Sequence, residues 1–430
     1  MKNKNILFAS LLSFLPITVF VGKGSDFTVK VGGGVDAQYG IINQEDAFKK
    51  DKSGKKYNQN GLTNSNSLKF DIDKKNDNGS SYGAFIKLNA DVEKDKEIKG
   101  TAKEAKVYFK GNFGEVELGS TSPVGNAMEV NSYSIARATG DLDGGWDDWL
   151  KNGAVISGSK NYKDGYLTAP QLPIGFDDES KANKINYFSP NINGFSFGVS
   201  YSPSSKGKGT TKQVRELLKD CGGGYRNVWQ PAVRYEKTFD GGIEFATAVL
   251  GEFAEAKDYS WDAEKDKEGK PDKPAGNIKR KNLAAWQVGA SVEYNGFAVA
   301  GSYGDFGKSG TKKEGREADK KYGAKYWSLG SAYSTSQYGI SINYMQSKRA
   351  GFIFGKDKNT AETSAKSTSE YNKLEAISVG ADYQVMPGFM PYVEVTRFKF
   401  KENKSFAVPN TSNLKFNKGT VFLVGTKVKF

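Results

Sequence analysis

The sequence contains no histidine and one cysteine, Cys221, among its 430 residues. Without histidine the chain cannot form a Ser–His–Asp or Cys–His nucleophilic site, and it has no imidazole to bind a metal ion. A single cysteine excludes an intrachain disulfide, so Cys221 is interpreted as an incidental loop thiol. We therefore predict that the protein is not an enzyme and that it uses no cofactor and no metal.

Long apolar runs are also missing after residue 22. A transmembrane helix needs about 18 uninterrupted apolar residues, and no later segment has them. The start of the chain differs. A basic MKNKN is followed by the apolar stretch 6–21 and by the small residues Gly22, Gly24 and Ser25. This order predicts a secretory signal peptide over residues 1–24. The alternative is a short N-terminal anchor helix.

Hydrophobic residues make up only 37% of the chain and the mean hydropathy is −0.59, yet 13% of the residues are aromatic and 50 are glycine. Disordered chains are poor in aromatic residues, so this composition does not indicate disorder. A barrel with apolar residues outside and polar residues inside would have such a composition. The net charge of +13 is spread along the chain, and together with the export signal this argues against nucleic-acid binding.

Alternation with period two recurs along the chain and predicts strands. In the last ten residues, Phe422, Val424, Val428 and Phe430 share one side with Thr426, whereas Lys427 and Lys429 point to the other. Sixteen segments are predicted as strands: 27–42, 67–73, 81–92, 103–110, 114–120, 184–189, 195–202, 227–237, 242–250, 285–294, 297–305, 324–334, 338–346, 375–385, 390–400 and 418–430.

The segment 390–400 has apolar residues at both odd and even positions. Val393 and Val395 would point to one face of a regular strand, whereas Tyr392, Phe398 and Phe400 would point to the other. We expect a bulge there.

The connections alternate between short turns, such as Asn295-Gly296, and long polar segments, such as 120–183. In a soluble sandwich or propeller, nothing requires all short turns to lie at one end. An outer-membrane barrel has short periplasmic turns at one end and longer external loops at the other. We therefore predict an all-β fold: a transmembrane antiparallel β-barrel of about sixteen strands, formed by residues 25–430.

Three stretches resemble the general bacterial diffusion porins, a family of sixteen-stranded trimeric barrels. They are GNFGEVELGS (111–120), INYFSPNINGFSFGVSYSP (185–203) and the terminal strand ending in Phe430, which resembles an assembly signal. The resemblance implies a homotrimer in the bacterial outer membrane, among membrane lipid and lipopolysaccharide. It also implies a water-filled channel for small hydrophilic solutes and ions.

The resemblance further implies that the third loop, here 120–183, folds into the lumen and narrows it. The loop contains GDLDGGWDDWL (140–150), which suggests an acidic edge. The alternative is a solvated acidic loop in which Trp146 and Trp149 form a local cluster. The carboxylates also suit a calcium ion, but their spacing matches no EF-hand. The candidate acidic residues are Asp141, Asp143, Asp147 and Asp148.

In the family, a basic ladder on the wall faces this loop, and strand parity provides candidates independently. Five lysines on the first four predicted strands alternate with apolar residues that are expected to face lipid, namely Val29, Phe70, Ile86, Val107 and Phe109. The inward lysines predict a mild preference of the channel for anions, which acidic residues on the same strands partly offset. The alternative for each is a solvated lumen or rim charge. The candidates are Lys30, Lys69, Lys87, Lys106 and Lys110.

Three other functions compete with an open diffusion channel. An extended aromatic track along the lumen would favour a substrate-specific channel or surface-binding barrel, but Phe85 and Tyr108 are too few to form such a track. A barrel enzyme would have to use carboxylates such as Asp147 and Asp148, whose side chains diverge if they are adjacent on a strand. A secreted adhesin leaves the terminal Phe and the alternation of loops unexplained.

Overall fold

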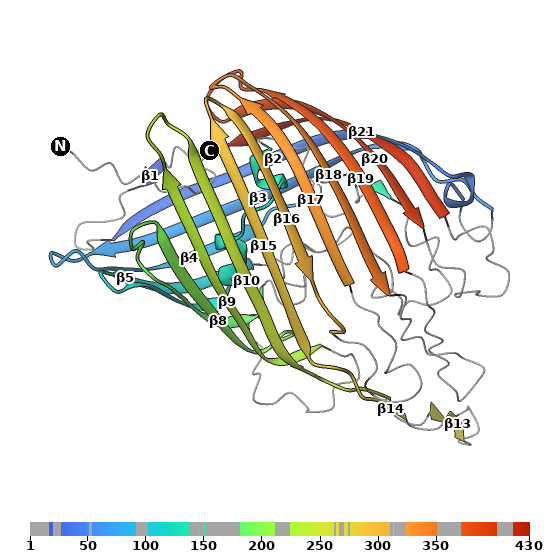
Figure 1. The fold of residues 1–430 in the computed structure, drawn as a ribbon, viewed down its shortest axis with the longest axis horizontal. Helices are drawn as coiled ribbons and strands as arrows, with labels where there is room; N and C mark the ends of the chain where they lie inside the picture. The colour runs from blue at the N-terminus through green and yellow to red at the C-terminus, as the bar shows by residue number, and fades with distance from the viewer. Residues whose placement is uncertain are drawn as a thin grey trace.

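The structure, a computed structural model, describes residues 17–19, 27–50, 54–91, 102–136, 146, 149–150, 181–210, 224–261, 264–265, 271–273, 276–309, 313, 324–350, 371–401 and 416–430. Its main sheet has 17 strands, and without the short β1 (Ile17–Val19) the remaining sixteen close into an antiparallel barrel. Closure occurs where β2 (Thr28–Gln44) pairs with β21 (Phe416–Lys429), so that the two ends of the barrel sequence lie side by side (Figure 1).

The barrel strands agree with the sixteen predicted segments. They are β2 (Thr28–Gln44), β3 (Asn60–Lys75), β4 (Ser81–Asn89), β5 (Ala102–Gly111), β6 (Gly114–Ser120), β7 (Asn183–Phe188), β8 (Phe195–Ser204), β9 (Tyr225–Thr238), β10 (Glu244–Ala256), β15 (Leu283–Tyr294), β16 (Phe297–Asp305), β17 (Ala324–Ser334), β18 (Tyr338–Ala350), β19 (Tyr371–Tyr383), β20 (Phe389–Lys401) and β21 (Phe416–Lys429).

A few short elements lie outside the barrel strands. The pairs β11 (Tyr259–Trp261) with β14 (Gly276–Ile278) and β12 (Glu264–Lys265) with β13 (Pro271–Lys273) are small separate sheets. The helical elements are η1 (Asp46–Phe48), α1 (Val124–Met128) and η2 (Tyr133–Ile135). No helix in the described part of the chain is long and apolar enough to cross a membrane.

Tight turns join the strands at one end of the barrel. Asn295 and Gly296 connect β15 to β16 with φ angles of 48° and 81°, as the Asn-Gly sequence predicts. These positive angles match a turn whose twist suits two antiparallel strands. The opposite end carries the longer connections, as the sequence indicates.

The outer face is apolar at mid-height and aromatic towards both ends. Val249, Val299 and Leu329 are each more than half exposed, as lipid-facing side chains are in an isolated barrel. Towards the long-loop end, three Trp–Tyr pairs lie on neighbouring strands, with ring centroids 4.6–5.4 Å apart: Tyr201–Trp229, Trp286–Tyr303 and Trp327–Tyr344. Rings such as Phe297 and Tyr333 lie at the turn end. The two belts are the girdles expected at membrane interfaces.

The bulge expected in 390–400 is absent, and that prediction is wrong. β20 pairs with β19 and β21 in continuous register. Val393 and Val395 face outwards, whereas Tyr392, Phe398 and Phe400 are buried on the inner face. The mixed parity arises because this strand carries large apolar residues on both faces, with inner aromatic side chains that have packing partners inside the barrel.

Candidate functional site

The predicted basic residues lie on one face of the first barrel strands. Lys30 in β2 lies opposite Asp71 in β3, Asp71 opposite Phe85 in β4, and Phe85 opposite Lys106 in β5. Directly opposite residues in a sheet point to the same side. Lys69 likewise lies opposite Lys87.

This face points into the barrel, because the residues that alternate with the lysines are exposed on the outside. Val107 and Phe109, for example, are 54% and 45% exposed. Tyr108 between them is buried, and its hydroxyl donates a hydrogen bond to Asp71 Oδ1 at 2.8 Å. Lys110 shares the face of Tyr108, and its Nζ lies 4.6 Å from the centroid of that ring.

The lysines of β5 have glutamate partners that the sequence analysis missed. Lys106 Nζ lies 2.5 Å from Glu117 Oε1 and 3.9 Å from Glu104 Oε1. Lys110 Nζ lies 3.2 Å from Glu115 Oε1. The signal was present in the sequence, because Glu115 and Glu117 alternate with the apolar Val116 and Leu118.

A second group of inner lysines lies on the strands that close the barrel. Lys69 in β3 lies opposite Gly32 of β2, and Lys429 in β21 lies opposite Gly34. The two glycines leave the inner face of β2 without side chains between these lysines. Lys427, the next inner residue of β21, lies 3.9 Å from Asp36 Oδ2. This group therefore carries more positive than negative charge.

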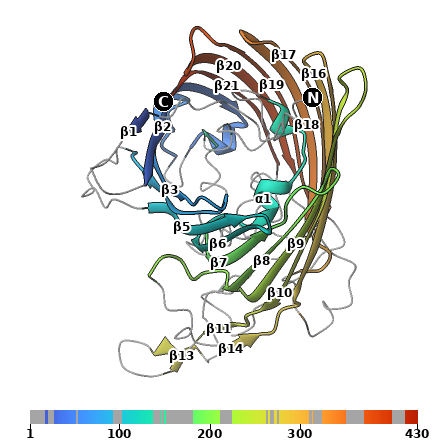
Figure 2. The same ribbon diagram turned by 90° about the vertical axis from the view of Figure 1, so that its left-hand side faces the viewer.

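The segment after β6 packs against another part of the inner wall. Figure 2 shows α1 inside the ring of strands. Val124 and Met128 of α1 form a buried cluster with side chains that include Val228 in β9 and Leu250 in β10. Val124 N–H also donates to Ser200 Oγ at 2.8 Å.

The same segment then crosses the inner face of β15. The carbonyl group of Val130 lies so close to Gly289 that a Cβ at this position would collide with it. Arg234 in β9 holds the segment from the side, because its guanidinium donates to the carbonyl oxygen of Glu129 at 3.0 Å.

Glu129 is a titratable residue of this segment whose pKa is shifted by its surroundings. Tyr133 donates a hydrogen bond to its Oε2 at 3.0 Å. Burial raises the pKa of Glu129 to about 7, although the hydrogen bond from Tyr133 and the charge of Arg234 oppose the rise.

Trp146 and Trp149 pack onto the wall on another side of the barrel. Trp146 is fully buried, with its ring 5.6 Å from that of Phe398 in β20. Trp149 Nε1 donates to Gln38 Oε1 at 2.9 Å, and its ring lies directly over Gly40. Both indoles therefore contact barrel strands. The predicted acidic residues Asp141, Asp143, Asp147 and Asp148 lie outside the described residues.

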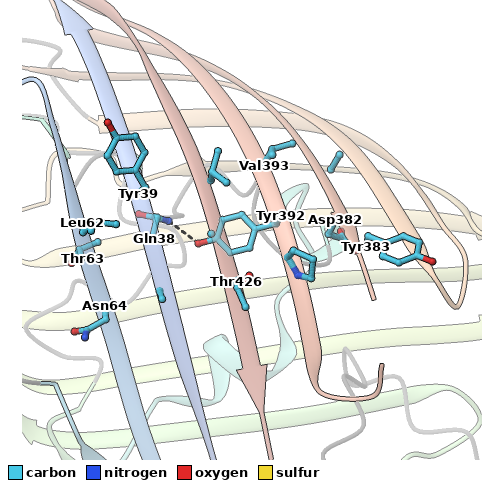
Figure 3. Close-up of a pocket in the computed structure, with 15 residues that line it drawn as sticks. Gln38, Tyr39, Leu62, Thr63, Asn64, Asp382, Tyr383, Tyr392, Val393 and Thr426 are labelled. Carbon is cyan, nitrogen blue, oxygen red and sulfur yellow. Dashed lines mark hydrogen bonds between the residues drawn. The ribbon is translucent and has the colours of Figure 1, made fainter. Parts of the chain in front are cut away.

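More aromatic residues point inwards than the sequence analysis identified, but most are covered. Phe398 and Tyr326 are each 1% exposed. Tyr392 is 3% exposed, and its hydroxyl donates to Asp36 Oδ1 at 2.8 Å. The same hydroxyl accepts a hydrogen bond from Gln38 Nε2 at 2.9 Å (Figure 3). These rings are packing groups rather than an open track for a substrate.

A pocket of about 1070 Å³ lies around Tyr392 but is not the channel (Figure 3). Its exposed lining residues point outwards, among them Tyr39, Val393 and Val424, which are 37–43% exposed. The pocket therefore lies on the outer wall across β2, β3 and β19–β21. Among the residues that the structure describes, no group of acidic, cysteine or histidine side chains is placed to hold a metal ion.

Comparison with known proteins decides the family. Residues 18–403 match the Gram-negative porin family. The chain belongs to that family. An uncharacterised protein of Rickettsia bellii is 28% identical over 361 residues, which is 75% of each chain. Outer membrane porin F of Escherichia coli is 28% identical over 117 residues, which is 27% of this chain and 30% of that protein.

Solved structures show the same fold. The anion-selective porin of Comamonas acidovorans has a TM-score of 0.56 at 15% identity, with 94% of this chain and 100% of that chain covered. OmpT of Vibrio cholerae in its trimer form has a TM-score of 0.54 at 11% identity, with the same coverage. As a Gram-negative porin with this barrel, the protein is an outer-membrane diffusion channel.

Proposed function

We propose that the loop 120–183 limits the size of the solutes that pass through this porin. The observation that carries the proposal is that described parts of this loop pack on two different sides of the inner wall. α1 contacts β9 and β10, whereas Trp146 contacts β20. Because these contacts lie on different sides of the inner wall, the loop is proposed to narrow the lumen, with the lysine-bearing wall of β2–β5 bordering the remaining space.

We further propose that this space prefers small anions. Lys30, Lys69, Lys87, Lys106 and Lys110 are proposed to line it. The pairing of Lys106 and Lys110 with glutamates reduces their contribution to the preference, and Lys87 and Lys429 add positive charge to the same wall. A wall with surplus positive charge lowers the energy of an anion within about a Debye length. The acidic residues of 140–150 are proposed to face this wall and to moderate the preference.

Single-channel recording tests both proposals. The purified, detergent-folded porin is inserted into a planar bilayer with a salt gradient across it. A reversal potential that favours chloride supports the lysine wall. A cation preference would shift control to the acidic loop, and a well-folded protein without conductance would contradict the open pore and favour a plugged or surface-binding barrel.

We also propose a homotrimer. The outer face of β3 carries Asn60, Asn64 and Asn66 where lipid-facing strands have apolar residues, and unsatisfied polar groups are costly in lipid. Asn64 also lines the outer pocket of Figure 3, and the asparagines and the pocket together form a surface suited to subunit contact. Conductance steps in groups of three, and a trimer mass in native mass spectrometry, are expected. A monomer by both methods would contradict the proposal.

Finally, residues 1–24 are proposed to direct export and to be removed. β1 lies within this segment and pairs with Val29–Val31 of β2. The mature chain would therefore keep the sixteen barrel strands and lose β1. The N-terminal sequence of protein purified from the outer membrane tests this, and a chain that begins at Met1 would contradict it.

A further inference from the structure

A row of lysines crosses the outer face of four neighbouring strands at the long-loop end of the barrel. Lys325 in β17 lies opposite Lys348 in β18, which lies opposite Lys373 in β19, which in turn lies opposite Lys401 in β20. We call these four residues the lysine row.

The lysine row points away from the lumen. The residues that alternate with it, Tyr326, Leu374 and Phe400, are buried on the inner face. Lys325, Lys373 and Lys401 themselves are exposed. Their charges therefore belong to the outer surface of the barrel and have no part in conduction through it.

Like charges directly opposite one another destabilise a sheet, and this row has four. No ion pair within 4 Å joins any of the four to another residue in the described part of the chain. The next outward positions of β20 carry two more positive charges, Arg397 and Lys399. One negative charge, that of Glu375, lies opposite Lys399. Asp305 lies opposite Lys325 at one end of the row. The surface thus has a clear surplus of positive charge.

The height of the lysine row is set by the aromatic girdle. Trp327 follows Lys325 by two residues on the same face, and its ring lies 5.0 Å from that of Tyr344. Beyond the girdle towards mid-height, the outer face is apolar, with Leu329 and Ile342 about half exposed. Two residues of strand span about 7 Å, so the row lies just outside the girdle, in the headgroup layer.

The row is local to one side of the barrel. The positions that precede the other two girdle tryptophans by two residues are Ala284, before Trp286, and Asn227, before Trp229. Neither is charged. A general preference for basic residues near the membrane surface therefore does not account for four lysines in register.

We propose that the lysine row binds the phosphorylated headgroup of a lipid in the outer leaflet. The ammonium groups match phosphate in charge, and the girdle and apolar belt next to them give the acyl chains of the same molecule a surface to pack on. A soluble anion would use the charge alone. This proposal depends on the outer-membrane location and not on whether or how the lumen conducts.

Native mass spectrometry of the full chain, folded in a non-ionic detergent, tests the proposal with diphosphoryl lipid A as the probe. The double variant K373Q/K401Q removes two adjacent members of the row. We expect it to weaken lipid A binding by about tenfold or more. The matched control K75Q/K237Q removes two exposed strand lysines at the opposite, short-turn end and is expected to bind as the parent chain does. Heat-modifiable gel mobility confirms that all three proteins form barrels.

Three results would overturn the proposal. Equal binding by both double variants would show that the row is not the site. Equal binding of diphosphoryl and fully dephosphorylated lipid A would show that phosphate is not recognised. Displacement of the lipid by millimolar inorganic phosphate, with equal protection of all four lysines from acetylation, would assign the row to a soluble anion instead.

Discussion

Glu129 lies between α1 and η2, where a carboxyl group contacts the inner wall rather than bulk water. Its pKa is about 7, whereas the ordinary value is 4.5. Between these two values the folded segment keeps a proton that an exposed chain has released. The free energy that holds the segment to the wall therefore decreases as the pH rises through this window.

We predict that backbone hydrogen exchange in residues 124–135, corrected for the intrinsic rate, is faster at pH 8 than at pH 5. The expected difference is on the order of tenfold or more, because one unit of pKa shift corresponds to a factor of ten. Glu129→Gln removes the ionisable group and should make exchange nearly independent of pH. The exposed Asp46→Asn serves as the control and should retain the dependence. If Glu129→Gln retains it as well, another group is responsible.

Lys87 and Lys69 show what strand parity can and cannot establish. Parity placed both on the inner face from sequence alone, because their neighbours Phe70 and Ile86 are apolar. It did not reveal that Lys106 would pair with Glu117, because a list of inner cations does not say which anions lie across the next strand. Pairing depends on register, and register is fixed by turns and long-range closure.

We predict that K69Q/K87Q lowers the permeability ratio of chloride over potassium by about twofold or more. These two charges face each other across β3 and β4, so an anion near the wall interacts with both. The measurement is the reversal potential in a salt gradient. K75Q/K237Q, which makes the same change in net charge at the short-turn rim, should leave the ratio close to that of the parent. An equal effect of both double variants would contradict a specific role for the wall.

At the scale of elements, β20 explains why one prediction from sequence failed. Period two predicts a strand that is apolar on one face and polar on the other. β20 breaks this rule, because Phe398 on its inner face packs on Trp146, which lies about 250 residues earlier in the chain. Nothing local to β20 indicates such a partner. Other strands also carry large apolar residues on the inner face, such as Leu250 in β10 and Tyr326 in β17, but β20 carries three aromatic ones, Tyr392, Phe398 and Phe400, so its parity was harder to interpret.

The Trp146 contact leads to a prediction about the loop. Truncating a fully buried tryptophan commonly costs about 3–5 kcal/mol of local packing. We therefore expect Trp146→Ala to release this part of the loop from β20 and to increase open-channel current noise. Trp286→Ala is the matched control, because Trp286 is 46% exposed on the outer face, the side of the wall opposite to the one on which Trp146 packs. Unchanged noise in Trp146→Ala would show that this contact does not hold the loop in the conducting state.

At the scale of the whole molecule, the pairing that closes the barrel extends to the last residue. The carbonyl oxygen of Phe430 accepts a hydrogen bond from Gly33 N–H at 2.8 Å, and its own N–H donates to Gly33 O at 3.2 Å. The ring of Phe430 lies against Gly33, where a Cβ would collide with it. The terminal strand therefore completes the hydrogen-bonded cylinder, which in lipid has to be free of open edges.

The side chain and the backbone of Phe430 should have separable roles. Phe430→Ala keeps both backbone hydrogen bonds to Gly33, so the purified variant should refold in detergent with normal heat-modifiable mobility. If the terminal aromatic ring is the assembly signal, the same variant should accumulate several-fold less folded barrel in the outer-membrane fraction of cells. Phe422→Ala removes an equivalent outward ring from the same strand and should assemble normally. Equal losses in cells for both variants would mean that apolar area on β21, and not its last residue, determines assembly.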